Sequence, residues 1–169
     1  MRPLLGRLFQ LLYFMLPAYA ANMAPPFVKY WKGWNPPIAS QALGGHKTVL
    51  GFVVGVSAAV VVTFVQSRLP WEGRLVQYEE WLGLGLRFGI GAMAGDSLKS
   101  FVKRRIGIAP GERWIPFDQL DFVIGALILT SSCAALSWLD WIVILVFSAG
   151  ADVLVTHLAY RLRIRDTKW

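Results

Sequence analysis

The segment 95–121, GDSLKSFVKRRIGIAPGERWIPFDQLD, is a long stretch in which charged residues, glycine and proline crowd together. On both sides the sequence is apolar in blocks of roughly 20 residues, the length that an α-helix needs to cross about 30 Å of hydrocarbon. Three of the chain's ten acidic residues, Asp96, Asp118 and Asp121, stand here at the edges of apolar blocks. We therefore interpret the segment as a candidate metal and polyphosphate site at a membrane surface.

The composition indicates an integral membrane protein. The chain has 169 residues, of which 56% are hydrophobic and 16% are charged, against about 25% charged in a typical soluble domain. We expect an all-α, polytopic membrane protein, a bundle of about five transmembrane helices with two long cytoplasmic loops, in which residues 1–169 form a single domain. The expected spans are 4–22, 48–67, 81–95, 116–137 and 138–160.

The basic residues predict the orientation of this bundle. With five spans, the loops 23–47 and 97–117 share one side with the C-terminal tail, and these regions hold 12 of the 17 lysine and arginine residues. The positive-inside rule places that side in the cytoplasm. The net charge of +7 is thus explained by topology and phosphate headgroups, and no nucleic-acid partner is expected. We expect a multi-pass protein of the cell membrane with its active site on the cytoplasmic face.

Helical spacing organises the charged segment. If the third apolar helix continues, Asp96, Lys99, Ser100 and Lys103 fall at i, i+3, i+4 and i+7 and share one face. Glycine and proline then break the helix, and Asp118 and Asp121 share a face on the first turn of the next one. We call the first of these two faces the basic stripe. Ion pairs between its own residues, or the favourable effect of the helix dipole on Asp118 and Asp121, would explain these charges by structure alone. However, two carboxylates on one face repel each other unless a cation lies between them, and this pattern is typical of Mg²⁺ sites.

Four further features stand outside this segment or at its start. Lys47 and Thr48 follow two glycines at the start of a helix, where free N–H groups can bind an anion, although a plain helix entry with a surface lysine explains them too. Gly91 and Gly95 predict close helix packing. Arg87 within a span could reach the membrane surface or pair with a buried acid, and the role of Asp152, an intramembrane acid, stays open.

Three carboxylates, a basic stripe and access to lipid favour phosphoryl or nucleotidyl transfer to a lipid, because such transfer depends mainly on metal, positioning and charge stabilisation. A lipid phosphate is already an anion and can attack without a strong general base. The alternative is a membrane cation transporter or channel that uses the acids as an ion path. That alternative predicts inverted repeats and charges near the midplane, whereas the sequence shows no repeat and the three acids fall at one interface.

The pattern Gly95-Asp96-Ser97-x-Lys99-Ser100-x-x-Lys103-Arg104, followed by Pro110-Gly111 and Asp118-x-x-Asp121, resembles the signature of the phosphatidate cytidylyltransferases. The match is closer to their archaeal relatives, the CDP-archaeol synthases. The similarity extends to the segments 19–25 and 45–48 and to a basic tail that ends in tryptophan. The chain departs from the pattern after Pro-Gly, where Glu112, Arg113, Trp114 and Gln119 replace the bacterial residues, and at Val49-Leu50.

This resemblance implies a membrane enzyme that joins CTP to an isoprenoid ether-lipid phosphate and releases diphosphate, with magnesium as cofactor. It implies that the metal is held by Asp118, Asp121 and Asp96, and that the catalytic set also contains Lys99, Lys103 and Arg104. The nucleotide-binding residues would be Lys47, Thr48, Ser97, Ser100 and Gly111, and Asn22 would bind the lipid substrate. The oligomeric state is not indicated.

Overall fold

The computed structural model describes residues 4–28, 31–45, 47–109 and 112–161, and this part of the chain is helical, with one isolated bridge between Pro37 and Thr48. The long helices are α1 (Leu4–Met23), α3 (Val49–Arg68), α4 (Trp81–Arg105), α5 (Phe117–Thr130) and α6 (Trp138–Arg161). Two short elements, η1 (Pro25–Val28) and α2 (Ser40–Leu43), lie in the connection between α1 and α3. The prediction of an all-α fold is confirmed for these residues.

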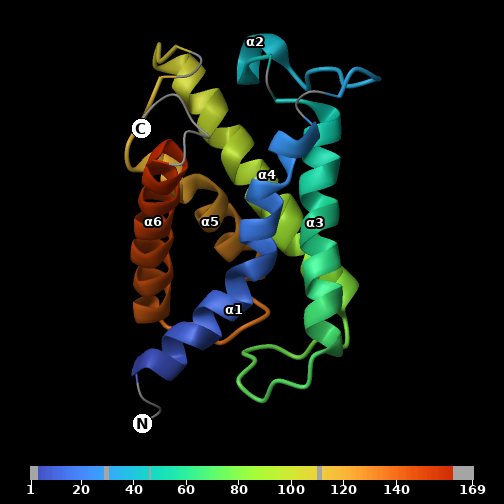
Figure 1. Cartoon of the computed structure of the whole chain (residues 1–169), viewed down its shortest axis with the longest axis vertical. Coiled ribbons are helices and arrows are strands. Elements are labelled where there is room, and N and C mark those ends of the chain that lie inside the picture. Colours follow the sequence, from blue (N-terminus) through green and yellow to red (C-terminus); the bar gives the residue numbers. More distant parts are fainter. Residues whose placement is uncertain (1–3, 29–30, 46, 110–111, 162–169) are drawn as a thin grey trace.

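The long helices alternate in direction along the bundle (Figure 1). The connections α1–α3 and α4–α5 therefore lie at one end of the molecule, and the connections α3–α4 and α5–α6 lie at the other. This arrangement agrees with the expectation that the two long loops share a side. Among the described helices, α3 alone is long and apolar enough to cross a membrane, so the number of spans stays a prediction.

Helix α4 is the centre of the bundle and packs against α1, α3 and α5. Its contact with α1 includes the edge-to-face pair of Phe14 and Phe88, whose ring centroids are 4.9 Å apart, and both side chains are buried. Small residues on α4 permit a close approach to both other neighbours. An added Cβ at Gly89 would lie 2.7 Å from Cα of Val56 on α3, a contact that only glycine avoids.

Helix α5 is shorter than predicted, since it ends at Thr130 instead of near Ser137. The serines that follow explain the early end, because serine side chains compete for backbone hydrogen bonds. The Ser131 hydroxyl donates to the carbonyl oxygen of Ile128 (2.8 Å), and the backbone N–H of Cys133 donates to Thr130 (2.9 Å).

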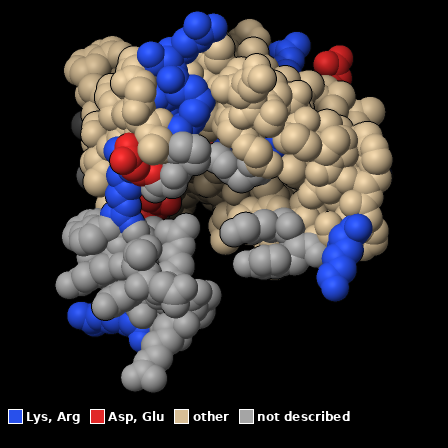
Figure 2. Space-filling view, turned by 90° about the horizontal axis from the view of Figure 1, so that it is seen from above, with Lys and Arg blue, Asp and Glu red and all other residues tan. Residues whose placement is uncertain are grey.

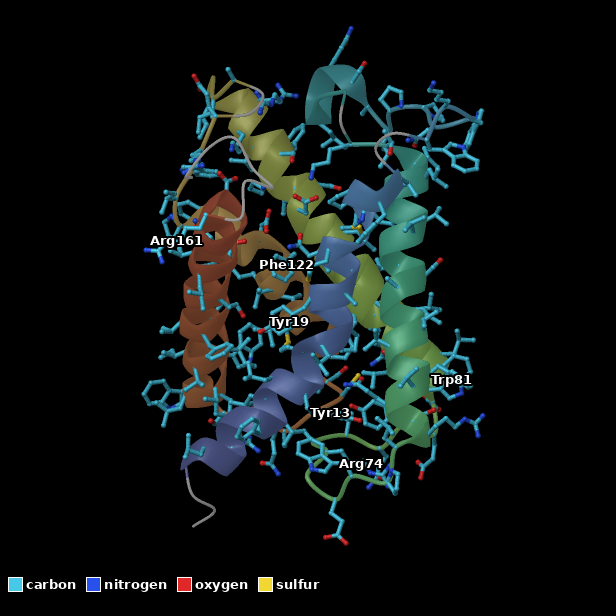
Figure 3. All side chains as sticks on the ribbon, viewed as in Figure 1. Tyr13, Tyr19, Arg74, Trp81, Phe122 and Arg161 are labelled. Atoms are coloured by element: carbon cyan, nitrogen blue, oxygen red, sulfur yellow. The ribbon has the colours of Figure 1, made fainter. Side chains whose placement is uncertain are left out.

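Helix α6 is attached to the rest of the bundle through α5 and α1. At one end, the Arg7 guanidinium forms a two-pronged ion pair with Asp140, at 2.6 Å and 2.9 Å. Farther along, the Tyr19 hydroxyl shares a 2.7 Å hydrogen bond with the Ser148 hydroxyl. The Tyr19 ring also packs edge-on against Phe122 of α5 in the middle of the bundle (Figure 3). The tyrosine thus joins three helices.

Candidate active site

The basic stripe predicted after Gly95 is helical in the structure. Helix α4 continues without a break through Arg105 and ends where Gly107 adopts a positive φ of 80°. The hydroxyl groups of Ser97 and Ser100 donate to carbonyl oxygens one turn earlier, at Met93 (2.7 Å) and Asp96 (3.0 Å). These two predicted nucleotide-binding residues therefore lie on α4, with their hydroxyl protons used within the helix.

The glycines of α4 and α5 determine how the acids meet. An added Cβ at Gly91 would lie 2.5 Å from the carbonyl oxygen of Gly125, and one at Gly95 would overlap the carbonyl oxygen of Asp121. The two backbones are consequently in direct contact, as the Gly-x-x-x-Gly pattern predicted. Because Asp96 follows Gly95 directly, this crossing brings Asp96 of α4 next to Asp121 of α5.

Lys99 lies at the centre of the acids. Its Nζ is 2.9 Å from Asp121 Oδ2, 3.1 Å from Asp118 Oδ1 and 3.4 Å from Asp96 Oδ1. The lysine side chain is 16% exposed and that of Asp121 is 5% exposed, so water screens these ion pairs only weakly. Two carboxylates on one helix face, such as Asp118 and Asp121, repel each other unless a cation lies between them, and in this structure that cation is the Lys99 ammonium group.

Lys103, one turn farther along α4, is buried and joins the α4–α5 connection to the site. Its ammonium group donates to both carboxylate oxygens of Asp118, each at 3.0 Å, and to the backbone carbonyl of Glu112. The carboxylate of Asp118 also accepts a 2.6 Å hydrogen bond from the backbone N–H of Trp114. Asp118 is therefore held by two lysines and by the loop before it.

Lys47 completes the charged group from the other long connection. Its ammonium group pairs with the second carboxylate oxygen of Asp96, and both side chains are 18% exposed. Thr48 is the N-cap of α3, where its hydroxyl accepts a 3.2 Å hydrogen bond from the backbone N–H of Gly51. We call the six residues Lys47, Asp96, Lys99, Lys103, Asp118 and Asp121 the ion-pair cluster.

The ion-pair cluster lies at the end of the bundle that carries the two long connections (Figure 1). Figure 2 views the molecule from this end and shows lysine and arginine atoms grouped across the face, with acidic atoms beside them. The formal charges within the cluster balance, because three ammonium groups face three carboxylates.

Other predicted site residues lie outside this cluster. Arg104 donates to the carbonyl oxygens of Ile108 and Ala109, the latter at 3.2 Å, and so binds the loop that follows α4. Asn22 lies in the last turn of α1. Gly111 lies outside the described residues.

Arg87, whose role the sequence left open, lies at a distance from the cluster along α4. Its side chain is exposed and donates to Ser132 Oγ (3.2 Å) and Cys133 Sγ (2.8 Å). Its observed partners are thus neutral groups at the end of α5. Asp152, the other open residue, lies in α6.

The oxygen donors of the three aspartates are the type of ligand that Mg²⁺ prefers. As the described side chains stand, no three of the His, Cys, Asp or Glu groups among them are arranged to hold a metal ion. The aspartates instead surround an ammonium group, at nitrogen–oxygen distances of 2.9–3.4 Å rather than the 2.0–2.1 Å of a magnesium–oxygen bond. The donor set fits the ion, and magnesium binding stays a prediction.

Comparison with known proteins identifies the family. The family model described as CarS-like CDP-archaeol synthase matches residues 4–169. A CDP-archaeol synthase from Sulfurisphaera tokodaii is 34% identical over 171 residues, which cover 96% of each chain. This chain belongs to the CDP-archaeol synthase family. It is therefore an enzyme of this type, a transferase of archaeal lipid biosynthesis associated with a membrane.

Further relatives of the CDP-archaeol synthase family agree with this assignment. CDP-archaeol synthases from Sulfolobus acidocaldarius and Methanopyrus kandleri are 31% and 32% identical, and cover 98% and 94% of this chain. A solved structure of an intramembrane enzyme for archaeal membrane lipids biosynthesis is similar, with a TM-score of 0.63 and 29% sequence identity. That similarity covers 89% of this chain and 92% of the solved one.

Proposed function

We propose that this enzyme transfers CMP from CTP to an archaeal ether-lipid phosphate, 2,3-bis-O-geranylgeranylglycerol 1-phosphate, and forms CDP-archaeol and diphosphate. A phosphate oxygen of the lipid attacks the α-phosphorus of CTP. The bond from that phosphorus to the bridging oxygen of the β-phosphate breaks, and diphosphate leaves with the electron pair. The observation that carries this proposal is the ion-pair cluster, which gathers three carboxylates and three lysines at one end of a bundle of a membrane-lipid enzyme.

The residues divide into two roles. Asp118 and Asp121, together with Asp96, would hold Mg²⁺, and the bound ion would supply positive charge to the phosphate oxygens. Lys99 and Lys103 lie on the same face of α4 and are positioned to neutralise the departing diphosphate.

Residues at the edge of this cluster would complete the binding of the substrates. Arg104 would add a third cation toward the diphosphate. Lys47, at the entry of α3, and Asn22, in the last turn of α1, would bind the lipid phosphate or the nucleotide. The N-terminus of α3 after Thr48, and Ser97, Ser100 and Gly111, would contact the nucleotide phosphates.

We place the protein in the cell membrane as a multi-pass enzyme whose cluster faces the cytoplasm, where CTP is available. This orientation is supported by the excess of basic residues in the two long connections, which lie at the end of the bundle that holds the cluster. The cation transporter or channel considered from the sequence finds no support in the family assignment.

The test is CDP-lipid formation by the purified protein with labelled CTP, Mg²⁺ and a geranylgeranyl ether-lipid phosphate. We expect Asp118→Asn and Asp121→Asn each to lower the rate by about 10²–10³-fold, because each removes charge stabilisation at the reacting phosphates. Glu79→Gln is the matched control, since Glu79 is an exposed acid before α4 at the other end of the bundle, and its rate should be unchanged.

A double variant of Asp118 and Asp121 with normal turnover would refute the assignment of the site. Absence of CDP-lipid from the wild-type protein, combined with cation movement across reconstituted vesicles, would support the transporter instead. Replacing the ether-lipid phosphate with a saturated or an ester-linked lipid phosphate tests the lipid specificity in the same assay.

A further inference from the structure

The Lys99 ammonium group occupies the place between carboxylates where a divalent cation would bind. Three acids from two helices face this one group at 2.9–3.4 Å, and the described residues show no other cation that contacts all three. An ion that bound two or three of the same oxygens at about 2.0–2.1 Å would have to enter the space within their reach. Two cations repel each other strongly at such a distance in a poorly screened site, so metal and ammonium compete.

A displaced Lys99 needs another anion. Within the cluster, Asp96 is also paired with Lys47, and Asp118 is also paired with Lys103 and with the N–H of Trp114. Asp96 and Asp118 therefore keep other cations when Lys99 leaves. Asp121 keeps a hydrogen bond from the backbone N–H of Phe122 but loses its ion pair with Lys99, and Lys99 itself loses its partners. The side chain is mostly buried, and an unpaired charge is costly in such a place.

We infer that Lys99 acts as an internal competitor of the divalent cation, so that the metal binds tightly only together with the nucleotide. This inference rests on the proposed function. The triphosphate supplies the anion that Lys99 requires after it leaves the acids, and the lysine then lies against the phosphates that it neutralises. By linkage, CTP raises the affinity for the metal, and the metal raises the affinity for CTP by the same factor. A metal ion that arrives without CTP must enter a cluster whose charges already balance, so it binds weakly.

The inference can be tested by measuring metal binding in the absence of turnover. Purified protein in detergent is dialysed to equilibrium against Mn²⁺ without lipid phosphate. CTP is either absent or present at the same concentration on both sides of the dialysis membrane. The excess of manganese on the protein side is then measured. The wild type should reach half-saturation at a free Mn²⁺ concentration at least tenfold lower with CTP than without it.

Three variants separate charge competition from other effects. Without CTP, Lys99→Gln should bind Mn²⁺ at least tenfold more tightly than the wild type. CTP should then increase the Mn²⁺ affinity of this variant by a correspondingly smaller factor. Lys99→Arg keeps the positive charge, so without CTP it should bind Mn²⁺ as weakly as the wild type. Arg105→Gln is the control on the same helix, because Arg105 is exposed, stacks on Phe101 and lies outside the cluster, so its binding should match the wild type.

Two results would overturn the inference. One is a wild type that binds Mn²⁺ equally well with and without CTP, and the other is a Lys99→Gln variant that binds the metal no more tightly than the wild type. If Lys99→Gln is unstable in metal-free buffer, its melting temperature should rise with Mn²⁺ by more than that of the wild type, because the ion replaces the lost ammonium group. The absence of that rise also counts against the competition.

The CDP-lipid assay distinguishes this failure from failure of the proposed function. If the wild type forms CDP-lipid while Lys99→Gln shows no gain in metal affinity, the competition is refuted and the proposed function stands. If the variant shows the gain while the wild type forms no CDP-lipid, the competition stands and the proposed reaction is refuted.

Discussion

Replacing Gly95 with alanine tests whether backbone contact between α4 and α5 determines the geometry of the site. The added Cβ would overlap the carbonyl oxygen of Asp121 and lie 3.0 Å from its carbonyl carbon and 3.3 Å from Cα of Gly125. Comfortable carbon–carbon contacts are about 3.5–4.0 Å, so the helices must separate by roughly 0.5–1 Å at this point. Overpacking of this kind typically costs about 1–3 kcal/mol of stability. A misplacement of about 1 Å at a reacting site typically costs about 10²-fold in rate.

The experiment compares Gly95→Ala with Gly83→Ala on the same helix. An added Cβ at Gly83 meets nothing within 4 Å, so this variant should be neutral or slightly stabilised by its better helix propensity. We expect Gly95→Ala to lower the melting temperature of the protein in detergent. We also expect it to lower the rate of CDP-lipid formation by about 10²-fold. A Gly95→Ala protein with wild-type melting and wild-type turnover would show that the helix crossing does not determine the spacing of the acids.

Three further predictions concern two contacts elsewhere in the bundle and the predicted metal ion. Arg7→Gln removes the ion pair with Asp140 at the other end of the bundle, and because Arg7 is partly exposed we expect a loss of only about 1–2 kcal/mol of stability with CDP-lipid formation intact; a large loss of activity would contradict this. Tyr19→Phe keeps the ring against Phe122 but removes the hydrogen bond to Ser148, so melting should show a loss of about 0.5–1.5 kcal/mol, and an unchanged melting curve would argue against this bond. Chelation of divalent ions with EDTA should stop CDP-lipid formation and added Mg²⁺ should restore it, whereas turnover that persists in EDTA would exclude the predicted cofactor.

Several parts of the fold and the site follow from short-range patterns in the sequence. The spacing of Asp96, Lys99 and Lys103 predicted one face of a continuous helix, and α4 contains all three. The cluster of Gly107 and prolines predicted the break before Asp118, and the structure shows a loop there. Helical periodicity and turn chemistry are local properties, so a single sequence is enough to predict them.

Other parts depend on contacts between distant residues. Side-chain spacing alone could not show that Lys99 reaches across the helix crossing to Asp118 and Asp121, since its own helix offers Asp96 as a sufficient partner. The carbonyl of Glu112 and the N–H of Trp114 hold Lys103 and Asp118, but backbone groups leave no trace in the residue types. The partners of Arg87 likewise could not be predicted, because Ser132 and Cys133 reach it only as a result of where α5 ends.

The short α5 has a consequence for the membrane around the enzyme. Its 14 residues give a helix of about 21 Å, against about 30 Å of hydrocarbon in a typical bilayer. Such a mismatch is met by local thinning of the bilayer or by neighbouring protein that covers the polar ends of the helix. If α5 crosses the bilayer, as the sequence predicts, thinning would draw the headgroups of the lipid beside it toward Asp118 and Asp121 at the start of this helix. On that prediction, bilayer thickness would affect how easily a lipid phosphate reaches the acids.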